Sequence, residues 1–82
     1  MQIDAPAIGA VVLTKSDLDA DDVAPAARLA IIATVAGSVK VKWANGSTGT
    51  YPFATGLTIL PMSIVRVFST GTTGTATFEN WL

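Results

Sequence analysis

The clearest periodicity in the sequence lies at residues 39–43, VKVKW, where apolar side chains alternate with two lysines. Successive side chains of a β-strand point to opposite faces, so this segment predicts a strand with one face in a core and the other in solvent. Asn45 and Gly46 follow, and this pair suits a tight hairpin because both residues tolerate positive φ. Residues 48–53, TGTYPF, are expected to return from that turn.

Two more strands are predicted earlier in the chain. Residues 9–15, GAVVLTK, carry a short β-branched run, and the acidic, Pro-containing stretch SDLDADDVAPA after it predicts a long loop. Residues 28–35, RLAIIATV, are open to interpretation as the tail of an Ala-rich helix, but the β-branched residues favour a strand. Residues 28–53 therefore predict a three-stranded antiparallel meander.

Pro61 interrupts the β-branched segment LTILPMSIVRVF. Because proline lacks an N–H group, it is expected at a strand start, at an edge or at a bulge. We therefore expect the next strand to begin near Met62. A last strand is predicted within residues 76–82, ATFENWL, where Trp81 and Leu82 are available to cover the core or to contact a partner.

The strand that follows the proline has no plainly polar face. Alternation places Ile64, Arg66 and Phe68 on one face, and it places Val65 and Val67 on the other. Strands that are apolar on both faces are normally covered on both. We expect one face to meet the core and the other to meet a neighbouring subunit.

Two arginines, Arg28 and Arg66, lie at the start of or within apolar strands. A buried charge without a partner is costly, so both guanidinium groups need acceptors. Carboxylates of the acidic loop, in the same subunit or across an interface, are suited to bind them through two hydrogen bonds. The alternative is that both side chains extend to solvent.

Short strands at regular spacing, with turns rich in Gly and Thr, predict an all-β fold, specifically a small antiparallel β-sandwich or barrel. No linker divides the chain, so residues 1–82 are predicted to be a single domain. Within it, residues 1–27 hold the N-terminal strand and the acidic loop, and residues 28–82 form the antiparallel β core.

Composition adds that the domain associates with other chains. A domain of 82 residues has a small core, and such domains are usually reinforced by disulfides, a metal or oligomerisation. This chain has no Cys and no His. Only 13% of its residues are charged and 50% are hydrophobic, so part of its apolar surface is expected to be covered by a partner.

The residue inventory also argues against catalysis. Without His or Cys, Ser-His-Asp and Cys-His arrangements are impossible, so we predict no enzyme, no catalytic residues and no cofactor. Asp17, Asp19 and Asp21 copy the start of a calcium loop, but Asp22 stands where its glycine is required and Arg28 stands where its closing glutamate is required. The match to an EF-hand fails and leaves at most a weak calcium site; we predict no metal centre.

The net charge of the chain argues against nucleic acid and anionic membranes as partners. With a net charge of −1, the chain has no basic field to attract nucleic acid or an anionic membrane surface. No apolar run approaches the roughly 20 residues of a membrane helix, and Arg28 interrupts the longest candidate. At the start of the sequence, Asp4 stands where a secretory signal needs Lys or Arg, so no signal peptide is expected.

An ordered set of motifs covers roughly the last two-thirds of the chain. An Arg opens a strand, a Gly centres a turn, Val residues alternate, and a Gly-x-x-hydrophobic-Leu-Pro run leads to a hydrophobic-x-Arg strand that ends in Thr-Gly-Thr-Thr. The positions are Arg28, Gly37, Val39, Val41, Gly56, Leu60, Pro61, Arg66, Thr70, Gly71, Thr72 and Thr73. This set resembles the spike base family of bacteriophages and gene transfer agents, from which the C-terminal FENWL departs.

The resemblance implies a structural virion protein on the capsid surface at the vertices. It implies a ring, which we expect to be a pentamer, that supports a head spike or fibre; a closed ring hides equivalent patches. The partners would be further copies of the chain, the major capsid protein and the spike or fibre protein. The candidate interface residues are Arg28, Pro61, Val65, Arg66, Val67, Thr72, Thr73 and Trp81.

Two alternatives stay open at this point. One is a capsid decoration or head-tail completion protein, which differs from a spike base in its number of copies per particle. The other is a small carbohydrate-binding module on a phage tip, in which Trp43, Tyr51 or Trp81 would provide a stacking platform. The second alternative predicts that at least one of these rings is exposed.

Overall fold

The computed structural model describes residues 8–82, which form seven β-strands and one turn of 3-10 helix. The elements, in chain order, are β1 (Ala10–Leu13), η1 (Asp19–Asp21), β2 (Arg28–Val35), β3 (Gly37–Trp43), β4 (Thr48–Phe53), β5 (Gly56–Leu60), β6 (Ile64–Val67) and β7 (Thr75–Trp81). β1 and the acidic loop occupy the described part of residues 1–27, and residues 1–7 of that predicted portion lie outside the described residues.

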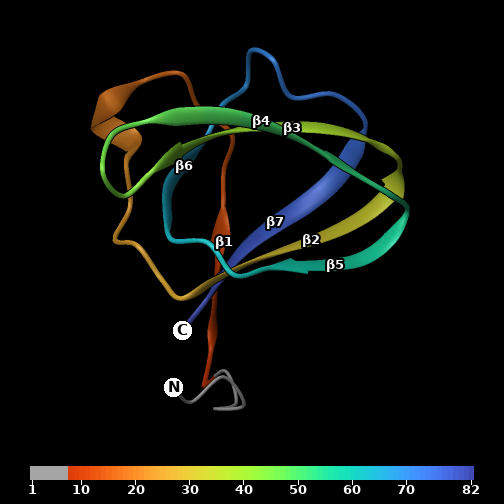
Figure 1. The fold of residues 1–82 in the computed structure, drawn as a ribbon, viewed down its shortest axis with the longest axis horizontal. Coiled ribbons are helices and arrows are strands. Elements are labelled where there is room, and N and C mark those ends of the chain that lie inside the picture. Colours follow the sequence, from red (N-terminus) through yellow and green to blue (C-terminus); the bar gives the residue numbers. More distant parts are fainter. Residues whose placement is uncertain (1–7) are drawn as a thin grey trace.

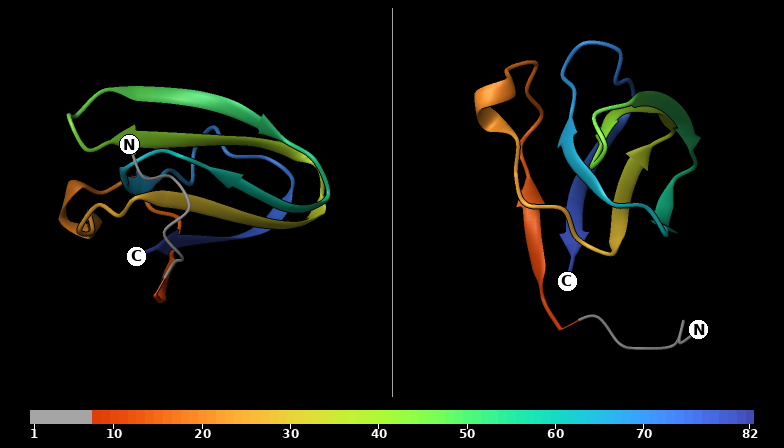
Figure 2. Two further views of the ribbon diagram at one scale, coloured as in Figure 1. Left: turned by 60° about the horizontal axis from the view of Figure 1, so that its bottom comes forward. Right: turned by 60° about the vertical axis from the view of Figure 1, so that its left-hand side comes forward.

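The strands form two antiparallel sheets that pack face to face (Figures 1 and 2). The first, sheet A, has the order β1-β7-β2-β5, and the second, sheet B, has the order β4-β3-β6. This arrangement confirms the predicted small all-β sandwich. No helix in residues 8–82 is long and apolar enough to cross a membrane.

The core lies between the two sheets and contains the inward side chains of both. Phe53 at the end of β4 and Phe78 of β7 meet edge to face, with ring centroids 6.0 Å apart. The alternation predicted for β3 is confirmed, since Val39 and Val41 are fully buried. The other core residues come mainly from β2 and β6 and include Leu29, Ile31, Ala33, Met62, Ile64 and Val67.

The predicted meander of residues 28–53 is wrong. β3 and β4 do pair, but β2 lies in sheet A, between β7 and β5. The chain crosses from one sheet to the other at Ala36, between β2 and β3. A glycine next to a strand marks a turn equally well for a hairpin and for a sheet-to-sheet corner, so the local pattern at Gly37 did not separate the two.

The segment around Pro61 also differs from its prediction. Residues 56–60 are a separate strand, β5, and the next strand begins at Ile64 rather than near Met62. Ile64 and Val67 both belong to the core, although strict alternation had placed them on opposite faces. The pairing of β6 with β3 shifts register between Lys42 and Trp43, and this irregularity rotates Ile64 inward.

The predicted tight hairpin at Asn45 and Gly46 joins β3 to β4, but Asn45 does not adopt the positive φ that was expected of it. The Trp43 N–H donates to the Ser47 carbonyl at 2.7 Å, and the Gly46 N–H donates to the Trp43 carbonyl at 2.9 Å. Gly46 has a φ of 92°, whereas no residue other than glycine in the described chain has a positive φ. Asn45 instead accepts hydrogen bonds from the N–H and the hydroxyl of Ser47 through its side-chain oxygen.

Candidate assembly surfaces

The acidic loop between β1 and β2 covers the free edge of sheet B. The Ser16 N–H donates to the Val67 carbonyl at 2.9 Å, and the Val23 N–H donates to the Val65 carbonyl at 2.8 Å. These bonds occupy the outer edge of β6, where a further strand would otherwise pair. The loop therefore closes this edge and brings its aspartates over the outer face of sheet B.

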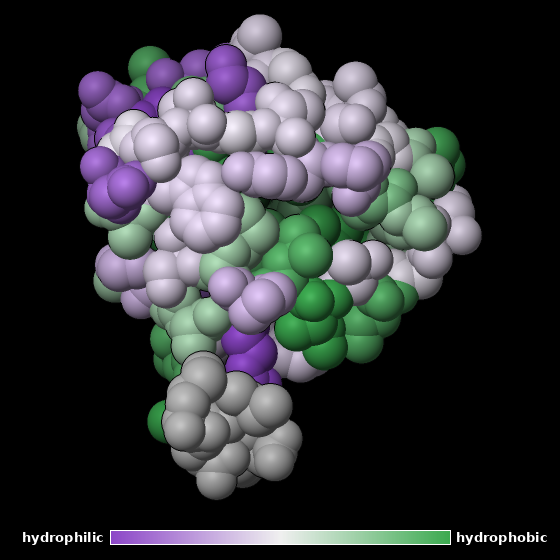
Figure 3. Space-filling view, viewed as in Figure 1, coloured by the Kyte–Doolittle hydropathy of each residue, from purple (hydrophilic) through white to green (hydrophobic). Residues whose placement is uncertain are grey.

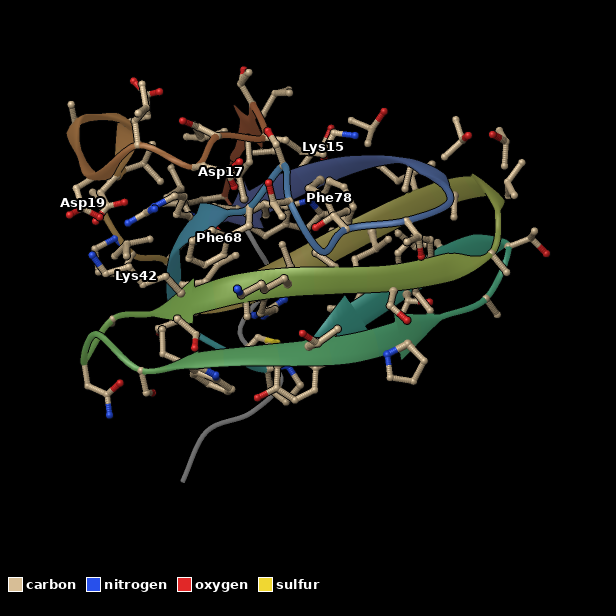
Figure 4. All side chains as sticks on the ribbon, turned by 90° about the horizontal axis from the view of Figure 1, so that it is seen from above. Lys15, Asp17, Asp19, Lys42, Phe68 and Phe78 are labelled. Carbon is tan, nitrogen blue, oxygen red and sulfur yellow. The ribbon has the colours of Figure 1, made fainter. Side chains whose placement is uncertain are left out.

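Arg66 lies beneath this loop with only 5% of its surface exposed. Its Nε donates to Asp22 Oδ1 at 2.6 Å, and its terminal NH2 group donates to Asp19. The Nζ of Lys42 donates to Asp22 Oδ2 at 2.8 Å and lies 3.8 Å from Asp19 Oδ1 (Figure 4). The carboxylates that bind Arg66 belong to the same subunit, which is one of the two predicted arrangements; the other was a carboxylate across an interface.

These contacts change the pKa values of Asp22 and Arg66. Asp22 accepts from both cations, and the hydrogen bond from Lys42, followed by that from Arg66, holds the pKa of its carboxyl below the ordinary value. The hydrogen bond to Asp22 raises the pKa of Arg66 against the opposing effect of burial, and Asp19 adds to the rise. Both shifts favour the charged forms of Asp22 and Arg66.

The lysine face of β3 is less exposed than predicted. Lys42 is half-buried by its contacts with the loop, and the Nζ of Lys40 lies 4.8 Å from the centre of the Phe68 ring. The guanidinium carbon of Arg66 lies 4.6 Å from the same ring. Phe68 is thus held by cation–π contacts with both side chains, outside the core.

The Thr-rich loop between β6 and β7 is tied to β3. The Thr72 hydroxyl accepts from the Lys40 N–H at 3.1 Å, and the Thr73 hydroxyl accepts from the Ser38 N–H at 3.0 Å. Thr70 donates to Asp17 through its N–H and its hydroxyl, and these two hydrogen bonds lower the pKa of the Asp17 carboxyl. The hydroxyls of Thr72 and Thr73 thus stabilise the loop itself.

The outer face of sheet A carries the charged residues Arg28 and Glu79 together with several exposed apolar side chains. The large apolar side chains on this face are Val12 of β1, Ile32 of β2, and Leu57 and Ile59 of β5, each between 42% and 63% exposed. In the space-filling view, hydrophobic surface gathers over the region of β2 and β5 (Figure 3). An exposed group of apolar side chains of this kind is typical of a contact surface.

A second apolar feature is a cavity of about 390 Å³ beside the edge of β4. Its lining is Trp43, Tyr51, Pro52, Leu60, Pro61 and Met62. The Trp43 and Tyr51 rings meet at an interplanar angle of 85°, and the Trp43 Nε1–H donates to the Tyr51 hydroxyl at 3.1 Å. Trp43 and Tyr51 are both partly exposed and line this recess, so the predicted stacking platform for a sugar stays a prediction.

The eight predicted interface residues are spread over the molecule. Arg28 and Trp81 are directly opposite each other on β2 and β7, and Trp81 donates to Glu79 at 3.0 Å. Val67 is 1% exposed, so its side chain belongs to the core of the single chain. The role of all eight in an interface, including Arg66, Pro61, Val65, Thr72 and Thr73, stays a prediction.

The aspartates of the acidic loop contact side chains of this chain. Among residues 8–82, no group of three or more carboxylates is placed to hold a metal ion. Asp17, Asp19 and Asp21, which share the spacing of a calcium loop, instead contact Thr70, Arg66 and Ser16 respectively. The spacing is therefore explained by hydrogen bonds within the protein.

A scan against protein-family models and a search of curated proteins found no match. Among solved structures, the chain is similar to one in a structure described as "Capsid of native GTA particle computed with C5 symmetry". The two chains share 31% identity and superpose with a TM-score of 0.77, and the alignment covers 100% of this chain and 90% of that one. This chain belongs to the family of that GTA capsid chain. The similarity supports a structural role in a phage or gene-transfer-agent virion.

Sequence reasoning missed three features of these surfaces. It predicted a loop aspartate as the partner of Arg66 but did not select Asp19 and Asp22, because a hydrogen bond across 44 residues depends on how the loop folds back. It did not anticipate that the hydroxyls of Thr72 and Thr73 bind β3, while their role in an interface stays a prediction. It did not separate β5, whose Gly56 and Pro61 boundaries were visible as turn residues.

Proposed function

We propose that the protein is a non-enzymatic spike base, a ring of identical subunits that supports a spike or fibre on the capsid. The observation that carries the proposal is the full-length similarity to a chain of the GTA capsid at 31% identity. The ring size that we propose for this chain is a pentamer, which can occupy a five-fold axis of a particle such as the one computed with C5 symmetry. The partners of the ring would be the major capsid protein and the spike or fibre protein.

The surface of the subunit supports a role in assembly. The outer face of sheet A exposes the large apolar side chains of Ile32, Leu57 and Ile59. A subunit of this size gains stability when such a face is covered by a neighbour. Nothing in a spike base requires a catalytic group.

The number of copies per particle tests the proposal. The measurement is quantitative mass spectrometry of purified, DNA-filled particles from the organism that carries the gene. We expect about 60 copies, one pentamer on each five-fold vertex. Several hundred copies would replace the spike base with a decoration protein on the capsid faces, and a handful would replace it with a head-tail component. Absence from the particles would overturn a virion role altogether.

A further inference from the structure

The two sheets differ in how their edges are protected. In sheet B, the acidic loop binds the outer edge of β6, and Pro52 lies within the other end strand, β4. In sheet A, the end strands β1 and β5 each pair on one side only, among residues 8–82. Their sequences, AVVL and GLTIL, contain neither a charge nor a proline. Unpaired edges without such protection are templates for pairing with another strand.

The strand directions at these two edges allow antiparallel pairing between copies. Every pair of neighbours in sheet A is antiparallel, so the first and last of its four strands run in opposite directions. When β5 of one copy lies beside β1 of the next, that pair is therefore antiparallel as well. The strands have similar lengths, five residues and four. The sheet can thus continue from copy to copy without a break in its hydrogen-bonding pattern.

The side chains at the two edges also match. The register places Val12, Glu79, Ala30 and Ile59 in one row across the outer face of sheet A. Val12 is 63% exposed and Ile59 is 44% exposed, and they form the two ends of this row. Joining copies edge to edge brings the valine of one copy next to the isoleucine of another. Apolar cross-strand pairs of this kind stabilise a sheet.

We propose that the subunits of the ring join head to tail, with β5 of each copy paired to β1 of the next. This inference rests on the proposed ring. A contact of this kind uses two different surfaces of each copy, as any ring of more than two subunits requires. A two-fold β5–β5 contact would give a dimer and would leave both β1 edges open. Head-to-tail pairing leaves no open edge in sheet A once the ring closes.

Cysteine crosslinking tests the pairing, because the natural chain has no Cys. The variant carries both Val12→Cys and Ile59→Cys and is treated with a bis-maleimide that reaches about 8 Å, the distance between diagonal neighbours on paired strands. Within one copy, the two positions are separated by three strand spacings, about 14 Å, so the reagent favours links between copies. We expect a ladder of covalent oligomers that ends at the ring size measured by light scattering.

The single variants are the matched controls. Neither Val12→Cys nor Ile59→Cys alone should give a covalent product, and an equal mixture of the two should give only dimers. Dimers from Ile59→Cys alone would overturn the proposal in favour of a two-fold contact. A ring seen by light scattering that does not crosslink would also overturn it, but would leave the proposed function intact. A monomer that does not crosslink overturns the pairing, and the copy number in particles then decides the spike base separately.

A charge at the edge provides a second readout. Ile59→Lys should weaken association at least tenfold, because it introduces a charge where β1 of the next copy would lie. Leu18→Lys is the control, since Leu18 is 64% exposed and lies in the acidic loop. Equal dissociation by the two variants would contradict a specific contact at β5.

Discussion

Arg66 and Asp22 are joined by a hydrogen bond of 2.6 Å between Nε and Oδ1, and 44 residues of sequence separate them. The contact holds the acidic loop against the outer face of sheet B, where Arg66 is almost completely buried. Removal of a partner from a buried charge is costly because the remaining charge keeps its desolvation penalty. The loop therefore completes the fold of sheet B as well as adding charge to the surface.

Replacement of Asp22 should destabilise the protein in a way that depends on pH. The pKa of Asp22 is lower in the folded protein than its ordinary value of 3.8, so its contribution is fully present above that value and is lost as the pH falls through the lower, folded pKa. Asp22→Asn should be less stable than the wild type at pH 7, and the difference should shrink toward pH 2. Urea denaturation between pH 7 and pH 2 measures the stability difference and its dependence on pH.

Asp21→Asn is the control for this experiment, because Asp21 is exposed in the same loop and accepts its hydrogen bond from Ser16. It removes the same charge without removing an acceptor from Arg66 or Lys42. Equal loss of stability in the two variants would mean that net charge, rather than the network, accounts for the effect.

Removal of the Thr72 hydroxyl should loosen the loop between β6 and β7. Thr72→Val keeps the shape of the side chain but leaves the half-buried Lys40 N–H without its acceptor, at a cost of about 1–3 kcal/mol in the free energy of unfolding. Amide hydrogen exchange at Lys40 should accelerate in parallel. Thr77→Val, at an exposed position on β7, is the comparison and should change stability by less than about 0.5 kcal/mol. Unchanged exchange at Lys40 would contradict the role assigned to Thr72.

A side chain at Gly37 should not fit. A Cβ atom there would overlap the backbone carbonyl of Thr73, where the β6–β7 loop passes β3. Gly37→Ala is expected to lower the free energy of unfolding by about 1–3 kcal/mol, as overpacking does in cores. Gly9→Ala is the control, because its Cβ would make only ordinary contact, at 3.8 Å from Leu82. Thermal denaturation compares the two, and equal midpoints would show that the loop moves aside without cost.

Local patterns predicted the strands better than they predicted the sheets. The alternation at Val39 and Val41 depends only on neighbouring residues, so both the strand and its buried face were predicted correctly. The meander was wrong because the corner at Gly37 changes sheets, and that choice is made by packing between distant segments. The inward position of Ile64 depends on a register shift against β3, for which the sequence has no local signal.

The sequence predicted some features of the candidate assembly surfaces and missed others. The shortage of charge predicted an exposed apolar face, and the need of Arg66 for a carboxylate predicted a loop aspartate. Which edges of the sandwich are open was not predictable, because this depends on the assignment of each strand to its sheet. The resemblance in the motifs led to the capsid class, which the structural similarity supports.

The acidic loop is held by ion pairs, whereas the edges of sheet A carry no charge. The ion pairs of Arg66 and Lys42 lie on the outer face of sheet B, whereas the edges β1 and β5 have no charged residue. Dissolved salt screens ion pairs near the surface, while a salting-out anion such as sulfate strengthens apolar contacts. A sulfate salt should therefore act on the acidic loop and on the edges of sheet A in opposite directions. In concentrated sulfate, the proposed contact between β5 and β1 would be strengthened while the acidic loop becomes easier to displace.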